Sequence, residues 1–288
     1  MVCFLTGRSK FNLLLGLILI GSYLWALMPA HAAQDYWQRK ALPKHPQRIV
    51  SLSPATTEML YALGAEARLV AVTQDCNYPA AALKKPKVGR FGNILLEKIL
   101  QQRPDLIVVT ADMGSRLEPL KALSIPVLAL ETRHVQDIMD NARLLGKLTQ
   151  TEKQAAVLTQ QWQARLPKVR NKHPRAFYMV WHDPLMAASR QSFIGDLMER
   201  SGARNVVSTA KAPFLRYREE SLLKANPELL IMPKSLATQL KLEQGIYAHL
   251  AAVKHKRVLV LEDDLISRPG PRSFDALQQI HQYIQAHF

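Results

Sequence analysis

Four aromatic residues lie close to Gly or Pro: Tyr78, Phe91 and Phe214 directly beside one, and Trp181 three residues before Pro184. Rings in loops that contain Gly or Pro are suited to stacking on a flat apolar ligand. They can equally cover the apolar underside of their own loops, as core residues do. The sequence leaves both interpretations open, ligand contact and core packing.

Charged residues gather in one loop near the C-terminus, where Arg268 and Arg272 flank a Pro-Gly-Pro turn. A guanidinium held by a rigid turn is preorganised to donate hydrogen bonds to amide or carboxylate groups, although both arginines can also be solvated. Asp263 and Asp264 are adjacent, so their side chains diverge and make a weak acid/base pair. This loop is therefore a candidate for ligand binding rather than for catalysis.

Motifs for enzymes and metal sites are absent. The chain has no GxSxG, P-loop, GxGxxG, HExxH or paired CxxC motif. Cys76 with His182 as its base is the one conceivable nucleophile, and no local pattern supports it. The nine histidines are scattered without the spacing of metal ligands. We expect no catalytic residue, no cofactor and no metal site.

Strands that alternate with short helices position these residues. Strands are expected at 48–53, 69–72, 106–110, 127–130, 175–181, 229–232 and 257–261, and helices at 54–63, 115–123, 192–201 and 274–287. This alternation predicts parallel sheets covered by helices on both faces. Ligands of such sheets bind beyond the carboxyl ends of the strands, which is where the candidate loops begin.

Two similar half-chains flank a predicted helix at residues 151–165. Its apolar residues, including Ala155 and Trp162, recur on one face, and Thr151 with Gln154 fits a capping box. On either side, six residues separate Glu97 from Pro104 and Glu220 from Pro227, and each proline precedes a buried strand. The pattern predicts an α/β fold of two lobes, joined by one long rigid helix, with a ligand cleft between them.

The first 32 residues have the pattern of a cleaved secretory signal peptide. Arg8 and Lys10 precede an apolar run at 11–27, and Ala-His-Ala at 30–32 fits a cleavage site; an uncleaved anchor is the alternative. Removing this segment lowers the formal net charge from +15 to +13 and leaves Cys76 without a disulfide partner. The basic mature chain favours an anionic ligand, a membrane or the envelope surface, and not nucleic acid.

Several motifs together resemble a known family. They are SLSPATTE at 51–58, CNYP at 76–79, the FGN loop at 91–93, WHDPLM at 181–186, and the two Glu-x6-Pro segments. The chain is similar to the helical-backbone class of periplasmic substrate-binding proteins, and within it to the cobalamin-binding components of ABC importers. Haem and ferric-siderophore receptors share the scaffold and remain alternatives; an exported hydrolase is a third.

The resemblance implies a role for particular residues. It places Pro54 and Ala55 on the cleft floor, and it assigns the two walls to Tyr78 and Phe91 from the first lobe and to Trp181, Phe214, Asp264 and Arg268 from the second. It also implies that Glu97 and Glu220, one per lobe, dock on a permease dimer in the inner membrane.

The sequence thus predicts a monomeric, non-catalytic receptor in the periplasm that binds a small molecule, a corrinoid. The expected divisions are a signal peptide at 1–32, a leader at 33–46, an N-terminal lobe at 47–149, a connecting helix at 150–170 and a C-terminal lobe at 171–288.

Overall fold

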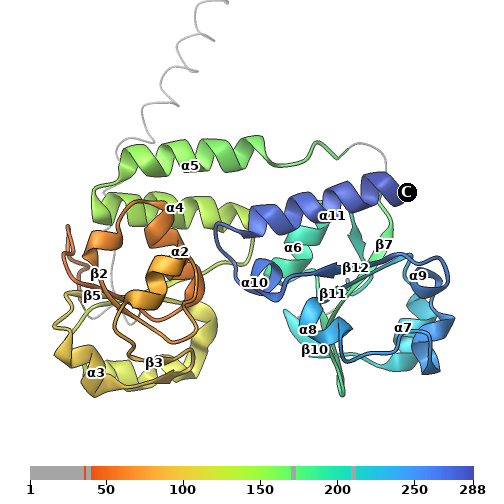
Figure 1. Ribbon diagram of the computed structural model, residues 1–288, viewed down its shortest axis with the longest axis horizontal. Helices are drawn as coiled ribbons and strands as arrows, with labels where there is room; N and C mark the ends of the chain where they lie inside the picture. Colours follow the sequence, from red (N-terminus) through yellow and green to blue (C-terminus); the bar gives the residue numbers. More distant parts are fainter. Residues whose placement is uncertain (1–35, 37–39, 170–172, 209–211) are drawn as a thin grey trace, which may run out of the picture.

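The computed structural model describes residues 36, 40–169, 173–208 and 212–288. The predicted signal peptide lies outside the described residues, as do most of residues 33–39 of the leader. Figure 1 shows two lobes side by side, with long helices along one side of both. Among the described residues, every helix is too short or too polar to cross a lipid bilayer.

The N-terminal lobe is built on a parallel sheet with the strand order β2-β1-β5-β6. Its strands are β1 (Ile49–Ser51), β2 (Leu69–Val72), β5 (Leu106–Thr110) and β6 (Val127–Leu130). Every residue of β5 is buried, as expected for a central strand that helices cover on both faces. Helices α2 (Pro54–Ala62) and α3 (Leu96–Gln101) flank the sheet, and a small hairpin joins β3 (Gly89–Arg90) to β4 (Asn93–Ile94).

One predicted helix of this lobe differs in form. Residues 115–123 were expected to be helical, and the segment Ala111–Ala122 instead forms tight 3₁₀ turns. Gly114 has a φ of 53° and Pro119 lies inside the segment, so neither residue supports a regular α-helix.

The C-terminal lobe repeats the same arrangement. Its parallel strands are β7 (Arg175–His182), β9 (Arg204–Asn205), β11 (Leu229–Pro233) and β12 (Val258–Leu261), and their pairing gives the order β9-β7-β11-β12. The predicted repeat is confirmed, because α3 leads into β5 as α7 (Glu219–Ala225) leads into β11. The other α-helices of this lobe are α6 (Phe193–Arg200), α8 (Lys234–Ala237), α9 (Ala251–Lys254), α10 (Asp263–Ser267) and α11 (Ser273–His287).

This lobe also has an antiparallel extension that the sequence did not predict. Strand β8 (Leu185–Ala188) pairs with the second half of β7, and β10 (Phe214–Arg216) pairs with β8. Trp181 and Phe214 therefore lie on strands. Trp181 is within the strand predicted at 175–181, whereas the assignment of Phe214 to a loop was wrong. Both added strands are too short for an alternating pattern to be visible, and only their pairing with β7 defines them.

Two antiparallel helices make up the connection between the lobes, α4 (Val135–Thr149) and α5 (Glu152–Ala164). Gln150, with a φ of 59°, turns the chain between them. Helix α5 is the predicted helix, but its capping box is absent. Instead, the hydroxyls of Thr149 and Thr151 lie 2.8 Å apart, and Gln154 donates to the carbonyl of Ala62.

The far end of α5 packs on the C-terminal lobe. The Trp162 ring stacks on Phe274 of α11 with centroids 5.2 Å apart, and Arg165 pairs with Asp275. In Figure 1, α5 lies over α4 and runs towards α11. The largest hydrophobic cluster accordingly extends from β1 through α4, α5 and α11 to β11, so both lobes share it. Each lobe also has a smaller cluster of its own.

Candidate functional site

A cavity of about 850 Å³ lies between the lobes, and a second of about 270 Å³ adjoins it. The two share Asp112, Ser267 and Pro269 as lining residues, so they form one continuous cleft. Much of the lining comes directly after parallel strands: Asp112 after β5, Glu131 to His134 after β6, Ser235 after β11 and Asp263 after β12. The cleft thus lies at the carboxyl ends of both sheets, where the sequence predicted it.

The start of α2 forms part of the smaller cavity. Ser53 is the N-cap of this helix, and its hydroxyl accepts a hydrogen bond from the Thr56 amide. Pro54 and Ala55 follow it and line the cavity. The resemblance placed both residues on the cleft floor, and their contact with a ligand stays a prediction.

One predicted ring from each lobe lines the cleft. Phe91 lines the smaller cavity, and its amide donates to the Asp75 carboxylate at 2.6 Å, which fixes the loop between β3 and β4. Phe214 lines the larger cavity from β10, where it pairs with Ala188 of β8. Two opposed walls therefore each offer an aromatic surface.

The other two predicted rings lie outside the lining of both cavities. The Tyr78 ring is exposed and stacks against the Arg272 guanidinium, with 4.2 Å from Cζ to the ring centroid. Trp181 is also exposed, and its indole N–H donates to the carbonyl of Asp183 in the β7–β8 hairpin. Ligand contact through these two rings stays a prediction.

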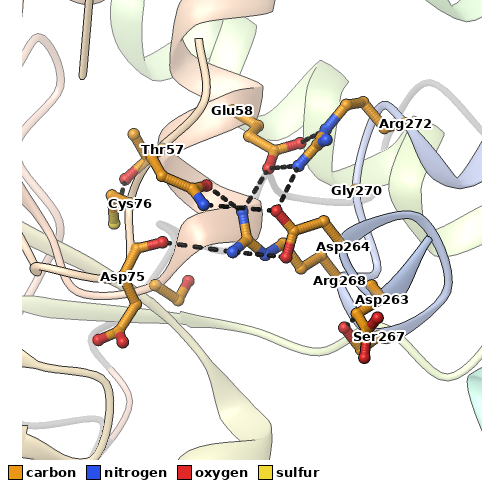
Figure 2. Close-up of polar contacts among 12 residues, drawn as sticks. Thr57, Glu58, Asp75, Cys76, Asp263, Asp264, Ser267, Arg268, Gly270 and Arg272 are labelled. Atoms are coloured by element: carbon orange, nitrogen blue, oxygen red, sulfur yellow. Dashed lines mark hydrogen bonds and ion pairs between the residues drawn. The ribbon is translucent and has the colours of Figure 1, made fainter. Parts of the chain in front are cut away.

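Four charged side chains join the lobes in what we call the interlobe ionic cluster, Glu58, Asp264, Arg268 and Arg272 (Figure 2). The Glu58 side chain, on α2, is only 2% exposed. Arg272 donates to both of its oxygens at 2.8 and 2.6 Å, and Arg268 lies 3.3 Å from one of them. Asp264 accepts from Arg268 at 2.7 Å.

Arg268 and Asp264 have protein partners that the sequence did not predict. Both were predicted to meet the ligand, and both are engaged with each other between the lobes. Arg268 also donates to the Asn77 side chain at 2.6 Å, while it still lines the smaller cavity. The hydrogen bonds from Arg272 to Glu58 raise the pKa of the arginine, so its positive charge is fixed. A carboxylate buried on α2 needs such countercharges.

The lining of the cleft is acidic, although the chain as a whole is basic. Arg133 pairs with Glu131, and the His134 ring lies 3.4 Å from Asp196. Three lining carboxylates make no ion pair within the described part of the chain, namely Asp75, Asp112 and Asp263. The cleft therefore offers hydrogen-bond acceptors rather than unpaired cations.

Cys76 is buried and free in the first lobe, where the hydroxyls of Thr57 and Thr73 lie within 3.2 Å of its sulfur. His182 lies at the end of β7 in the second lobe and lines a surface hollow with Glu220. Nothing in the described residues brings this pair together as a nucleophile and its base.

The two predicted docking residues occupy equivalent positions. Glu97 is exposed in the first turn of α3, and Glu220 is exposed in the first turn of α7. Figure 1 places α3 and α7 in different lobes, both on the side away from α5. The repeat thus presents two similar acidic positions on one side of the molecule.

Several residues that line the larger cavity were not predicted as ligand contacts. They are Asp112, Glu131 and Asp263, which follow strands and of which Asp263 was considered only as half of a weak acid/base pair, and Tyr178 on β7. The rule that ligands bind at the carboxyl ends of parallel strands would have selected the first three. Tyr178 gave no signal, because a tyrosine in an apolar strand has the pattern of a core residue.

Two lobes of matching strand order, with a cleft between them that both lobes line, define a two-lobed ligand-binding protein. A family model described as periplasmic binding protein matches residues 49–265. The chain belongs to this family of substrate-binding transport proteins.

Named relatives agree with this membership. The chain is 26% identical over 252 residues to a vitamin B12-binding protein of Vibrio cholerae, covering 85% of this chain and 91% of that one. It is 30% identical over 253 residues to a vitamin B12-binding protein of Pectobacterium carotovorum, covering 84% and 89%.

Solved structures share the fold. The periplasmic vitamin B12-binding protein BtuF of Vibrio cholerae matches with a TM-score of 0.76 and 26% identity, over 85% of this chain and 99% of that one. The periplasmic haem-binding protein BhuT matches with a TM-score of 0.74 and 22% identity, over 83% and 98%. The second likeness is evidence for the fold alone.

Proposed function

We propose that this protein is a non-catalytic periplasmic receptor that captures cobalamin and delivers it to an ABC importer. The observation that carries the proposal is the interlobe cleft, which has an aromatic ring on each wall and unpaired carboxylates in its lining. The vitamin B12-binding relatives support the same ligand.

The chemistry of a corrinoid fits this cleft. Its macrocycle is broad and apolar, and its edge carries primary amides whose N–H groups need acceptors. Phe91 and Phe214 provide apolar surface for the ring system, and Asp112 and Asp263 provide acceptors for amides. Pro54, Ala55, Tyr78 and Trp181 are proposed as further contacts.

Haem or a ferric siderophore is the alternative on the same fold. His134 and Tyr178 line the cleft, and both are residue types that serve as axial ligands of haem. The propionate carboxylates of haem and the anionic ferric siderophores, however, need cationic partners. The two arginines of the cleft, Arg133 and Arg268, already pair with carboxylates. The cleft electrostatics therefore favour the corrinoid.

Equilibrium dialysis of the purified mature chain against cyanocobalamin, haemin and a ferric siderophore complex tests the proposal. We expect saturable binding of one cyanocobalamin per chain and no saturable binding of the other two. Phe214→Ala should weaken cyanocobalamin binding, and Val157→Ala, on the exposed face of α5, should leave it unchanged. Saturable haemin binding in the absence of cyanocobalamin binding would contradict the proposal.

We further propose that the receptor is monomeric and that Glu97 and Glu220 dock on the two subunits of the permease. A permease with two-fold symmetry presents two equivalent sites, and the repeat supplies two equivalent acidic positions.

A further inference from the structure

Tyr178 is a buried polar residue at the wall of the cleft. It lies on β7, is 3% exposed and lines the larger cavity. Its hydroxyl makes no hydrogen bond within residues 36, 40–169, 173–208 and 212–288. A buried hydroxyl without a partner is unfavourable, so such a group in a binding cleft indicates contact with a ligand.

Asp263 lines the same cavity, at the start of α10 after β12. Burial and the charge of Asp263 raise the pKa of Tyr178, so the phenol keeps its proton and is a donor at every physiological pH. The carboxylate itself is held in place, because one oxygen accepts from the Ser235 amide at 3.1 Å and the other from the Ser235 hydroxyl. Each carboxylate oxygen can accept a second hydrogen bond.

We propose that Tyr178 and Asp263 form a recognition site for a primary carboxamide on the C-terminal wall of the cleft. The Tyr178 hydroxyl donates to the carbonyl oxygen of the amide, and Asp263 accepts from its N–H. The inference rests on the proposed function, since a corrinoid is the ligand class that carries several such amides.

The pair distinguishes an amide from the corresponding acid. A carboxylate at the same place on the ligand would accept from Tyr178 but would face Asp263 as a second negative charge, with no N–H to donate. The site would therefore select ligands whose side chain is amidated. This selectivity is a property of the second lobe alone, because both residues belong to it.

The variant Tyr178→Phe separates a ligand role from a structural one. Because the hydroxyl makes no hydrogen bond to any other described residue, its removal should leave Tm unchanged or raise it. The affinity for cyanocobalamin, measured by equilibrium dialysis, should fall about 5- to 10-fold, as expected for the loss of one hydrogen bond. Tyr61→Phe, on α2 outside the cleft lining, is the matched control and should change neither quantity.

A second experiment uses the unmodified chain with the cyanocobalamin monocarboxylates, each with one amide hydrolysed to an acid. One isomer should bind at least 10-fold more weakly than cyanocobalamin, and Asp263→Asn should reduce this difference. Equal binding of all isomers, or unchanged affinity of Tyr178→Phe, would refute the amide-recognition site. The proposed cobalamin-binding function would not be affected by that result. Failure of the unmodified chain to bind cyanocobalamin at all would instead overturn the proposed function.

Discussion

The energetics of single residues are clearest in the interlobe ionic cluster. Glu58 is nearly inaccessible to solvent and satisfies two arginines from the other lobe. A buried ion pair adds little net stability relative to an apolar replacement, but removing one partner leaves the others uncompensated. The cluster is therefore sensitive to the loss of any one member.

Replacing Glu58 with Gln should lower the free energy of unfolding by about 3 kcal/mol. The reason is that Arg268 and Arg272 would then share Asp264 as their remaining carboxylate in the cluster. The measurement is the urea concentration at the midpoint of unfolding. Glu66→Gln, at an exposed position just after α2, should shift the midpoint little, and equal shifts for the two variants would contradict this account.

Part of the site could be predicted from residue types and spacing. Phe91 and Phe214, which stand beside Gly or Pro, line the cleft; so do Pro54 and Ala55, which only the resemblance to a known family placed there. The engagement of Arg268 with Glu58 could not be predicted, because 210 residues separate them and only the docking of the lobes brings them together.

Among the elements, the packing of α4 against α5 depends on one close contact, between Gly146 and Ala155. A Cβ atom added at Gly146 of α4 would lie 2.7 Å from the Cβ of Ala155 on α5, well inside van der Waals contact. The two helices can pack this closely only because one position has no side chain. The connection between the lobes is thereby a paired and stiff element.

Gly146→Ala should destabilise the protein, even though alanine is the better helix former by about 1 kcal/mol. The clash with Ala155 should outweigh that gain and cost about 1–3 kcal/mol net, measured as a lower Tm. The double variant Gly146→Ala with Ala155→Gly places the small residue on α5 instead of α4. It should recover most of the lost stability. A Tm that rises in the single variant would contradict the proposed packing.

The elements that the sequence predicted are those with strong local signals. Continuous apolar runs identified β5 and β11, and the Ser53-Pro54 start identified α2. The strands β8 and β10 were not predicted, because they have only four and three residues. They become strands only because β8 pairs with β7 and β10 pairs with β8. These short strands carry Phe214 into the cleft, so the missed elements matter for the site.

At the scale of the whole molecule, the two lobes present their acidic positions together. The double variant Glu97→Ala with Glu220→Ala should retain cobalamin affinity and abolish cobalamin uptake by cells that carry the importer. Both residues lie outside the cleft lining. Their helices, α3 and α7, are on the side of the molecule away from α5 (Figure 1).

The control for the docking variant is Glu152→Ala, which also removes an exposed glutamate from the first turn of a helix but lies on α5. It should support normal uptake. Parallel loss of affinity and uptake in the double variant would show that the two glutamates act on the ligand, and would refute the docking assignment.

The hydrophobic cluster that both lobes share bears on how an importer could recognise a loaded receptor. Because one hydrophobic cluster joins both lobes, we expect the outline of the protein to change little when a ligand binds. Under the docking proposed above, the permease would then distinguish the loaded receptor by the ligand itself, exposed at the opening of the cleft between Glu97 and Glu220.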